Sequence, residues 1–392
     1  MFKDFTPQEK KIVNSITFAV AVRMLGLFLL LPVLSPYLKT LENATPQLIG
    51  IAIGIYGLAQ ATLQIPFGYL SDRYGRKPVI IAGMITYIVG SVMAGVVSSM
   101  WSMIFARFLQ GFGAVSSAIT ALTADLVREE IRARAFAQIG ASIALTFLLS
   151  MVVAPLLAGS LGVPFLFFLT AFLSLITIVL LILTVPEPEV REREISPSLY
   201  NLFKLMADKN QTFLNISVGL LHALLVVVFT LVPYKLVYDI GLPKLQHWKV
   251  YIPAVLVSLL MTFFLIFLAE RKRRFKEVFM LGVLALGLSF VSFEGANGLT
   301  AVSLGILLFF LGFMILEALI PSLLTRLTHK DLRGISFGLF NTVQFLGAFV
   351  GGIWGGYALK HGQQLMTYTA LILCLVWVFV SLLWFKTLKL SK

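Results

Sequence analysis

Apolar runs of about 20 residues recur along the whole chain, and each is long enough to cross a hydrocarbon core about 30 Å thick. With 59% hydrophobic and 12% charged residues, the composition excludes a soluble globular domain. Backbone groups that face lipid must form hydrogen bonds within their own segment, so the runs are expected to be helices. The sequence therefore predicts an all-α membrane protein with twelve transmembrane helices, at residues 12–35, 48–70, 78–98, 101–123, 135–159, 163–185, 212–238, 248–269, 276–294, 299–323, 334–358 and 366–385.

The distribution of positive charge predicts the topology. The net charge of +13 is compatible with nucleic-acid binding, but 24 of the 31 Lys and Arg residues fall in the tails and in every second loop. Five lie on the opposite side, and Arg23 and Arg107 lie within spans. By the positive-inside rule both termini are expected in the cytoplasm, which requires an even number of crossings. The pattern excludes nucleic acid as a partner and indicates a lipid bilayer.

A long polar stretch divides the chain into two halves. Residues 186–210 contain three prolines and a run of alternating charges, which predicts a cytoplasmic linker between a bundle at 1–185 and a bundle at 211–392. A weak internal repeat supports this division, because Leu70–Arg73 recurs as Leu268–Arg271 near half the chain length later. Two six-helix bundles related by an axis along the membrane normal are expected to form a binding cavity at their interface.

Four charges and two glycines stand between the second and third apolar runs, in the segment Gly68–Pro78. Glycine permits sharp turns, and Asp72 can accept hydrogen bonds from a helix N-terminus or a neighbouring arginine. The spacing of the glycines, the acid and the cations resembles the signature loop between helices 2 and 3 of the major facilitator superfamily. The resemblance implies the major facilitator fold and a secondary transporter.

Further motifs extend the resemblance over the whole chain. Arg107–Gly111 is similar to the family's motif in span 4, and Arg23–Gly26 and Gly50–Gly57 are similar to the drug:proton antiporter branch. In span 5, Ala154–Gly159 has alanine where that branch usually has glycine before the proline and at one of a glycine pair. The nearest relatives in the branch imply a soluble domain after the last span, but the chain stops within about seven residues of it.

Ionisable residues within spans are the best candidates for the mechanism, because a charge in lipid is costly and usually needs a partner or a water-filled cavity. Glu317 is the only acid well inside a span, and His222 lies within span 7. A carboxyl group in a cavity can exchange a proton when water reaches it from alternate sides, and histidine titrates near neutral pH. Glu317, with His222, is therefore the predicted proton-coupling site. The alternative is a polar pair that only joins two helices.

Two cations within the first bundle allow two interpretations. Arg23 and Arg107 can form an anion-binding pair in the cavity, or they can be structural and donate to backbone carbonyls. Arg107 and Gln110 are expected to share a helical face with Ala114 and Ala118, whose small side chains permit close packing. The predicted substrate cavity is lined by Arg23, Tyr56, Gln60, Arg107, Gln110, Asn341 and Gln344.

The charged loop after span 2 is predicted to act as a conformational latch, since it sits at the membrane boundary and is too shallow for the cavity. The resemblance implies that Asp72 bonds to the N-terminus of span 11 near Gly334, and that Arg73 pairs with Asp125 at the end of span 4. The alternative is a role in folding and topology alone. The expected latch residues are Gly68, Asp72, Arg73, Gly75, Arg76 and Asp125.

These observations predict a proton-coupled exporter, or antiporter, of amphipathic small molecules in the bacterial inner membrane, working as a monomer by alternating access. The alternative within transport is proton-coupled uptake of an organic anion. A membrane enzyme acting on lipid is a remote alternative, because the four His residues are scattered and no catalytic spacing stands out. The proton gradient is the expected energy source, and no cofactor or metal is expected. The single cysteine, Cys374, allows no intramolecular disulfide.

Overall fold

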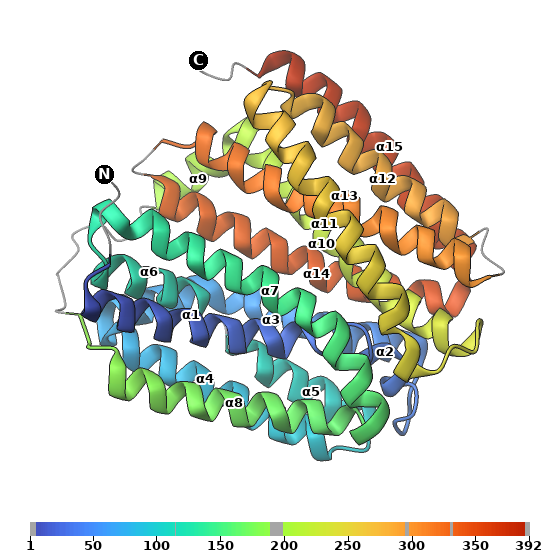
Figure 1. The fold of residues 1–392 in the computed structure, drawn as a ribbon, viewed down its shortest axis with the longest axis horizontal. Coiled ribbons are helices and arrows are strands. Elements are labelled where there is room, and N and C mark those ends of the chain that lie inside the picture. Colours follow the sequence, from blue (N-terminus) through green and yellow to red (C-terminus); the bar gives the residue numbers. More distant parts are fainter. Residues whose placement is uncertain (1–4, 114, 189–198, 295–297, 330–331, 389–392) are drawn as a thin grey trace. The chain divides into compact units, whose positions relative to one another are not determined.

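The computed structural model describes residues 5–113, 115–188, 199–294, 298–329 and 332–388 (Figure 1). These residues are almost entirely helical and contain no β-strand apart from an isolated bridge between Glu42 and Ser99. Twelve of the described helical segments are long and apolar enough to cross a membrane, as the sequence predicts. The chain divides into two compact units, which are described separately.

The first unit consists of Met1–Leu48 and Ile55–Ser196. Its helices are α1 (Pro7–Phe28), α2 (Leu34–Leu38), most of α3 (Pro46–Tyr74), α4 (Arg76–Val96), α5 (Met100–Gly111), α6 (Ser116–Leu126), α7 (Glu129–Leu161) and α8 (Val163–Thr184). The segment Ile49–Gly54 of α3 is counted with the second unit.

The second unit consists of Ile49–Gly54 and Pro197–Lys392. Its helices are α9 (Leu199–Ala207), α10 (Lys209–Tyr238), the short 3-10 helix η1 (Lys244–Gln246), α11 (Trp248–Arg271), α12 (Phe275–Glu294), α13 (Leu299–Leu327), α14 (Arg333–His361) and α15 (Gln363–Thr387).

Two sequence predictions need correction. The run 12–35 is not one helix, because α1 ends at Phe28 and turns precede α2. The run 101–123 is broken between α5 and α6, so Ala118 does not continue the helical face of Arg107 and Gln110, and Ala114 lies outside the described residues.

The linker at 186–210 stays a prediction. Its described part contains α9 and the start of α10, while residues 189–198 lie outside the described part.

Close packing accompanies the break in the fourth span. A Cβ on Gly111 would lie 2.4 Å from the Cβ of Ala59 and 2.7 Å from the backbone oxygen of Tyr56, so only glycine lets α5 approach α3 this closely. The Gly113 carbonyl, which lies in the break, accepts a hydrogen bond from Nε of Arg23 at 3.0 Å. A buried side chain thus supplies a donor to backbone that has left the helix.

Helix ends in the first unit follow local sequence signals. Thr6 and Glu9 form a reciprocal capping box at the start of α1, and Pro7 occupies the first helical position. Between α3 and α4 the chain turns at Gly75, whose φ of +98° favours glycine. One residue therefore ends one span and begins the next, which sets a tight loop at this point.

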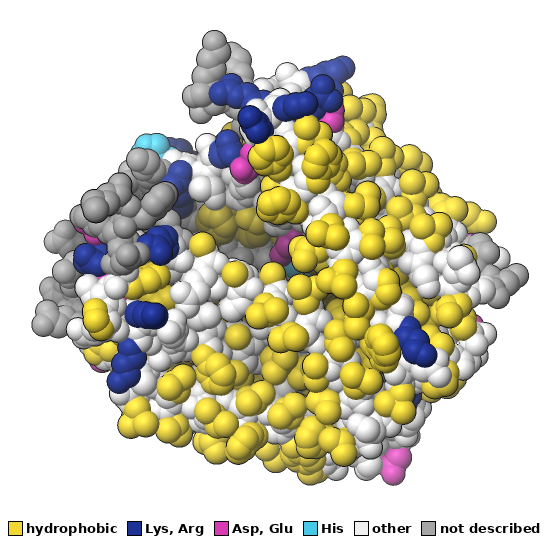
Figure 2. Space-filling view, in the orientation of Figure 1, with side chains coloured by type: hydrophobic (Ala, Val, Ile, Leu, Met, Phe, Trp, Pro, Cys, Tyr) yellow, Lys and Arg dark blue, Asp and Glu magenta, His cyan; other side chains and the backbone are white. Residues whose placement is uncertain are grey.

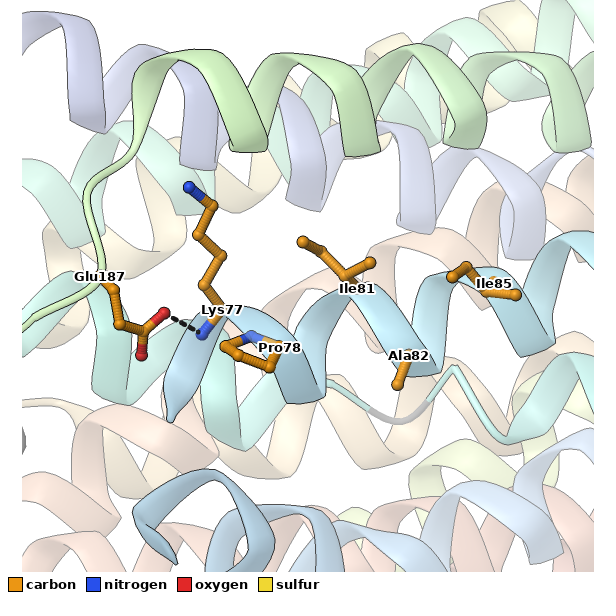
Figure 3. A pocket seen from close by; sticks show the side chains of 6 residues that line it. All are labelled: Lys77, Pro78, Ile81, Ala82, Ile85 and Glu187. Carbon is orange, nitrogen blue, oxygen red and sulfur yellow. Dashed lines mark hydrogen bonds between the residues drawn. The ribbon is translucent and has the colours of Figure 1, made fainter. Parts of the chain in front are cut away.

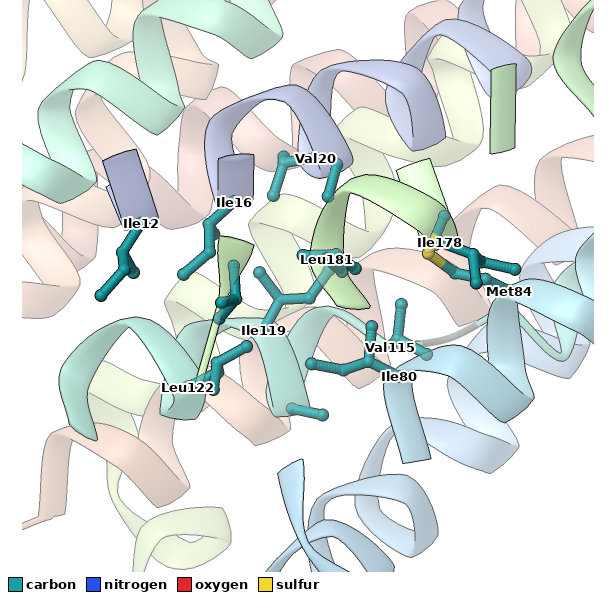
Figure 4. Close-up of a cluster of buried hydrophobic side chains, with 13 residues drawn as sticks. Ile12, Ile16, Val20, Ile80, Met84, Val115, Ile119, Leu122, Ile178 and Leu181 are labelled. Carbon is teal, nitrogen blue, oxygen red and sulfur yellow. The ribbon is translucent and has the colours of Figure 1, made fainter. Parts of the chain in front are cut away.

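The core of the first unit is a cluster of aliphatic side chains from four helices (Figure 4). These side chains come from α1, α4, α6 and α8, and they include Ile16 and Ile80, which are fully buried. On α11, by contrast, large apolar side chains are exposed: Leu260 and Phe263 are 73% and 78% exposed. Hydrophobic side chains cover much of the face shown in Figure 2, as expected for a surface that contacts lipid.

A glycine seam joins α10 and α14 in the second unit. A Cβ on Gly347 would lie 2.0 Å from the backbone oxygen of Gly219, and one on Gly351 would lie 2.2 Å from that of Ala223. The two residues are one helical turn apart, so their Cα atoms face the same neighbour. Small residues in this arrangement allow two helix backbones to pack closely. Van der Waals contacts can then hold the helices together in lipid, where the hydrophobic effect does not.

We expect Gly351→Val to destabilise the second unit by about 2–3 kcal/mol, because the added side chain must push the backbone of α10 away. The matched control is Gly338→Ala in the same helix, where a new Cβ meets nothing within 4 Å. Thermal unfolding of the two purified variants measures the difference. An equal melting temperature for both would show that the seam tolerates side chains.

Candidate functional site

The predicted proton-coupling residues come together in the second unit. His222 lies near the middle of α10, and Nε2 of its ring is 3.8 Å from Oε2 of Glu317 on α13. The same nitrogen lies 2.8 Å from Nε2 of Gln344 on α14. Three helices therefore contribute one polar group each to a single point, and two of the three residues were singled out as proton-coupling residues by sequence.

The hydrogen bonds assign the tautomer of His222. Nδ1 lies 3.1 Å from the backbone oxygen of Val218, which can only accept, so Nδ1 carries the proton. Nε2 is then the acceptor for the Gln344 amide, and it is the atom nearest to the Glu317 carboxylate. Protonation of Nε2 would break the bond from Gln344 and create a donor facing Glu317.

Burial differs sharply between the two titratable groups. The His222 side chain is only 10% exposed and meets the ring of Phe313 edge-on at 5.8 Å, whereas the Glu317 side chain is 42% exposed. Among the described residues, Oε2 of Glu317 has no hydrogen-bond partner. This oxygen is the one that faces His222 and it is itself buried, so the exposure of the Glu317 side chain comes from its other atoms.

Arg23 of the first unit is buried among neutral acceptors. Its side chain donates to the Gly113 carbonyl at 3.0 Å, to Oε1 of Gln60 at 2.6 Å and to the hydroxyl of Ser116. The residue is 7% exposed. Because all of these partners are neutral, the guanidinium charge is not compensated by them, and the contacts match the structural interpretation of this arginine.

Arg107 belongs to the same polar network. Its Nη1 donates to Oε1 of Gln110 at 2.8 Å, and its guanidinium lies 5.0 Å from the ring centroid of Tyr56. The Tyr56 hydroxyl accepts from the amide of Gln60 at 3.1 Å, which links Arg107 to the partners of Arg23. All five predicted cavity residues of the first unit therefore form one connected network.

The remaining predicted cavity residues are on α14. Gln344 contacts His222, while Asn341 lies about one helical turn earlier and is partly buried. The predicted cavity takes residues from both units, so a shared binding site stays a prediction.

The charged loop forms a compact ion cluster centred on Arg76. Its guanidinium is 2.5 Å from Asp72, 3.1 Å from Asp125 and 2.7 Å from the hydroxyl of Ser71. The sequence analysis expects Arg73 to pair with Asp125, and the structure corrects this, because Arg76 occupies that position and Arg73 lies over the ring of Tyr74. The reason is geometric. Asp72 and Arg76 are four positions apart, on either side of the turn at Gly75, and this turn directs the side chain of Arg76 back toward α3 and α6.

Two further latch expectations have different outcomes. A Cβ on Gly68 would meet Ser117 only at an ordinary 3.6 Å, so packing does not require glycine there. The bond from Asp72 to the N-terminus of α14 would join the two units and stays a prediction.

Glu187 is a partner of this loop that the sequence analysis misses. Its carboxylate accepts from the backbone N–H groups of Arg76 at 2.6 Å and Lys77 at 3.0 Å, which are unpaired donors at the start of α4 (Figure 3). In return, Nζ of Lys77 donates to the carbonyls of Ile182 and Val185 at the end of α8. The negative charge of Glu187, just after α8, therefore lies at the positive N-terminal end of α4, and the positive charge of Lys77 lies at the negative C-terminal end of α8. An acid in a polar stretch directly after a span was the available signal.

The twelve apolar helices define a multi-pass α-helical membrane protein, and comparisons with known proteins give its family. The profile described as Major Facilitator Superfamily matches residues 16–352, and the chain belongs to this superfamily. It is 39% identical to the "Inner membrane transport protein YajR" of Escherichia coli (strain K12), over 96% of this chain and 84% of that protein.

More distant relatives agree with the family. The "Multidrug resistance protein MdtH" of Salmonella arizonae is 26% identical over 87% of this chain and 84% of its own length. Among solved structures, the nucleoside transporter NupG superposes with a TM-score of 0.76 at 16% identity, covering 98% of this chain and 100% of that one. The chain belongs to a superfamily of transporters and is 39% identical to a transport protein, so it is not an enzyme, and the remote alternative of a lipid-acting enzyme is set aside.

We expect Arg23→Lys to lower stability by roughly 2–4 kcal/mol, because one ammonium cannot replace three donors aimed at separate acceptors, and a buried acceptor without a donor costs about 1–3 kcal/mol. The matched control is Arg73→Lys, an exposed arginine. Melting temperatures measured without any added substrate separate this structural role from anion binding. An unchanged Arg23→Lys protein would reject the structural role.

We expect Glu187→Ala to destabilise the first unit by about 1 kcal/mol, the usual cost of losing a side chain that caps a helix. Glu187→Gln should fall between, since its amide oxygen can still accept from one N–H group. The control is Glu270→Ala, which removes an exposed ion pair to Arg326 at 3.4 Å and should have little effect. Hydrogen exchange of the Arg76 and Lys77 amides reports the cap directly, and equal exchange in all variants would contradict it.

Proposed function

We propose that the chain is a proton-driven exporter of amphipathic small molecules in the inner membrane of a bacterium. The observation that carries this proposal is the convergence of His222, Glu317 and Gln344 in the membrane-spanning part of the second unit. The exposure of 42% of the Glu317 side chain supports access of water to the carboxyl group, while its Oε2 lies buried on the side of His222.

The geometry supports a simple exchange of the proton. As a carboxylate, Glu317 can only accept hydrogen bonds, and it faces Nε2 of His222 at 3.8 Å. When Glu317 takes up a proton from water, its carboxyl group becomes a donor and can compete with the Gln344 amide for that nitrogen. The hydrogen bonding between α10, α13 and α14 therefore depends on the protonation state, which couples protons to helix packing.

The energy comes from the proton gradient. Each proton that moves inward across the potential supplies about 2.3 kcal/mol per 100 mV. Substrate and proton are exchanged by alternating access, in which the ion cluster around Arg76 acts as a latch that is made and broken. We further propose that the protein works as a monomer and needs no cofactor.

A second candidate, proton-coupled uptake of an organic anion, is favoured by one observation. Arg23 is 7% exposed, and the contacts given above for its side chain are neutral. A buried positive charge of this kind attracts an anion when the surrounding helices open. The extra observation required is substrate movement in the same direction as the proton.

The test is transport in sealed proteoliposomes that contain a pH-sensitive dye, with ethidium as a cationic probe and carboxyfluorescein as an anionic probe. For export, we expect substrate to trigger proton movement in the opposite direction, and Glu317→Gln to abolish it because the variant has no titratable group at that position. Glu277→Gln, an exposed acid in the first turn of α12, is the matched control and should transport normally.

Other outcomes decide between the candidates. Proton and carboxyfluorescein movement in the same direction would assign uptake. Substrate flux with no proton signal, unchanged in Glu317→Gln, would leave the pair with His222 as a structural contact. His222→Gln tests the second residue, and we expect a shifted pH profile of transport, since Gln cannot titrate.

A further inference from the structure

His247 is a buried titratable group that the transport mechanism does not use. It lies between η1 and α11 and is only 1% exposed. Its Nε2 lies 3.1 Å from the backbone oxygen of Leu242, which can only accept, so Nε2 carries the proton. Nδ1 is then an acceptor, and among the described residues it has no hydrogen-bond partner. His247 is therefore an uncharged group with a vacant position for a proton.

A second buried polar atom without a partner lies one helical turn further along the chain. The side chain of Tyr251 is 1% exposed, and its hydroxyl has no hydrogen-bond partner in the part of the chain that the structure describes. The rings of His247 and Tyr251 meet edge-on, with centroids 6.5 Å apart. A buried polar atom without a partner is costly, so two such atoms at one place point to a site that is completed in another state.

The charges around His247 oppose a proton on its ring while the site is closed. Lys244 acts on the ring with a positive charge. Protonation would add a second positive charge and a donor without an acceptor. The ionisable side chains of the surrounding elements are Lys235 and Asp239 at the end of α10, Lys244 on η1, Lys249 and Tyr251 on α11, and Glu294 at the end of α12. Asp239 is exposed, and α13 has no ionisable side chain from Leu299 to Leu316.

A continuous series of ring contacts joins His247 to His222. Neighbouring rings in the series have centroids between 5.8 and 6.5 Å apart, and all of the residues are buried. In order from the turn between α10 and α11, the rings belong to His247, Tyr251, Phe229, Phe310, Phe309, Phe313 and His222. Close-packed side chains leave little room for one ring to move alone. A displacement of Tyr251 is therefore passed to Phe313, which packs against His222.

We propose that His247 and Tyr251 form an acid-sensing proton site in the turn between α10 and α11. The predicted topology puts this turn on the side of the membrane opposite to the termini. When that side is acidic, Nδ1 of His247 takes up a proton and donates a hydrogen bond to the Tyr251 oxygen. The added positive charge beside Lys244 then weakens the closed turn, and the ring series carries the displacement to His222. The proton site stands on its own contacts, whereas its effect on transport through His222 rests on the proposed function.

Opening of the turn should increase as the pH falls. His247 is neutral in the closed turn, whereas an exposed histidine binds a proton with a pKa of about 6.5. Proton uptake therefore favours the open turn below about pH 6.5, by up to about tenfold for each pH unit. Above that pH the open turn gains no proton, and the closed turn keeps its full stability.

The experiment follows the turn directly in the full chain. In a Cys374→Ala background, Leu245→Cys, which is 46% exposed on η1, carries an environment-sensitive fluorophore. The protein is kept in detergent micelles without substrate or gradient, so the result does not depend on proton coupling at Glu317. The pH is lowered from about 7.5 to about 4.5, the range in which histidine titrates. His247→Gln is the test variant, and His361→Gln, at an exposed position of α14, is the matched control.

We expect the emission of the label to change as the pH falls, with a response that is lost in His247→Gln and kept in His361→Gln. Tyr251→Phe should move the midpoint to lower pH, because the protonated ring loses its acceptor. This second variant keeps the test open if His247→Gln does not fold. Constant emission over the whole range, or an equal response in His247→Gln, overturns the acid-sensing site. An unmoved midpoint in Tyr251→Phe overturns the pairing with Tyr251.

Nuclear magnetic resonance of 13C-labelled histidine tests the ring series. We expect the resonance of His222, assigned with His222→Gln, to shift over the same pH range as the label. Phe310→Leu should reduce this shift about twofold, since leucine stays apolar but removes two ring contacts in the middle of the series. A His222 resonance that follows pH identically in the unsubstituted protein and in His247→Gln overturns the transmitting role of the rings.

Discussion

Every backbone polar group within the hydrocarbon core must find a partner inside the protein, and this constraint governs the structure. It explains why the described residues are helices nearly throughout, and it makes each departure from the helix informative. The clearest departure is the break after Gly111, which is accompanied by a buried arginine that donates to the backbone at Gly113. The single hydrogen bond from Arg23 to Gly113 gives a partner both to the buried guanidinium and to a backbone carbonyl in the break.

The first unit holds its buried cations in two ways. Arg23 donates to an amide, a hydroxyl and a carbonyl, all of which are neutral, whereas Arg76 is paired with the carboxylates of Asp72 and Asp125. In the second unit, a histidine and a carboxylate lie 3.8 Å apart. The neutral network satisfies a buried charge by geometry alone, while the ion pairs also depend on the charge of the acids.

Much of the fold follows from the sequence, because span length and the position of charges are properties of short segments. The twelve spans and the turn at Gly75 were predictable in this way. The break in the fourth span was not, since the apolar run continues through it and its cause lies in a contact with Arg23, far away in the chain. The sequence singled out His222 and Glu317 as rare ionisable residues within spans. It did not give the distance between them, because that distance depends on how α10 and α13 are rotated about their axes. Motif reasoning also stops at the partner of Asp125, because Arg73 and Arg76 have the same chemistry and only the turn at Gly75 decides which of them reaches the acid.

The exchange of charges between α4 and α8 has a consequence for biosynthesis. The carboxylate that caps the start of α4 comes from a residue 111 positions later in the chain. While the ribosome is still producing the first five spans, the backbone donors of Arg76 and Lys77 have no such partner, and the loop that carries Asp72 lacks its final support. The loop can form all of its contacts only after the sixth span has been inserted. The first half of the protein therefore completes its fold when its last segment has been synthesised.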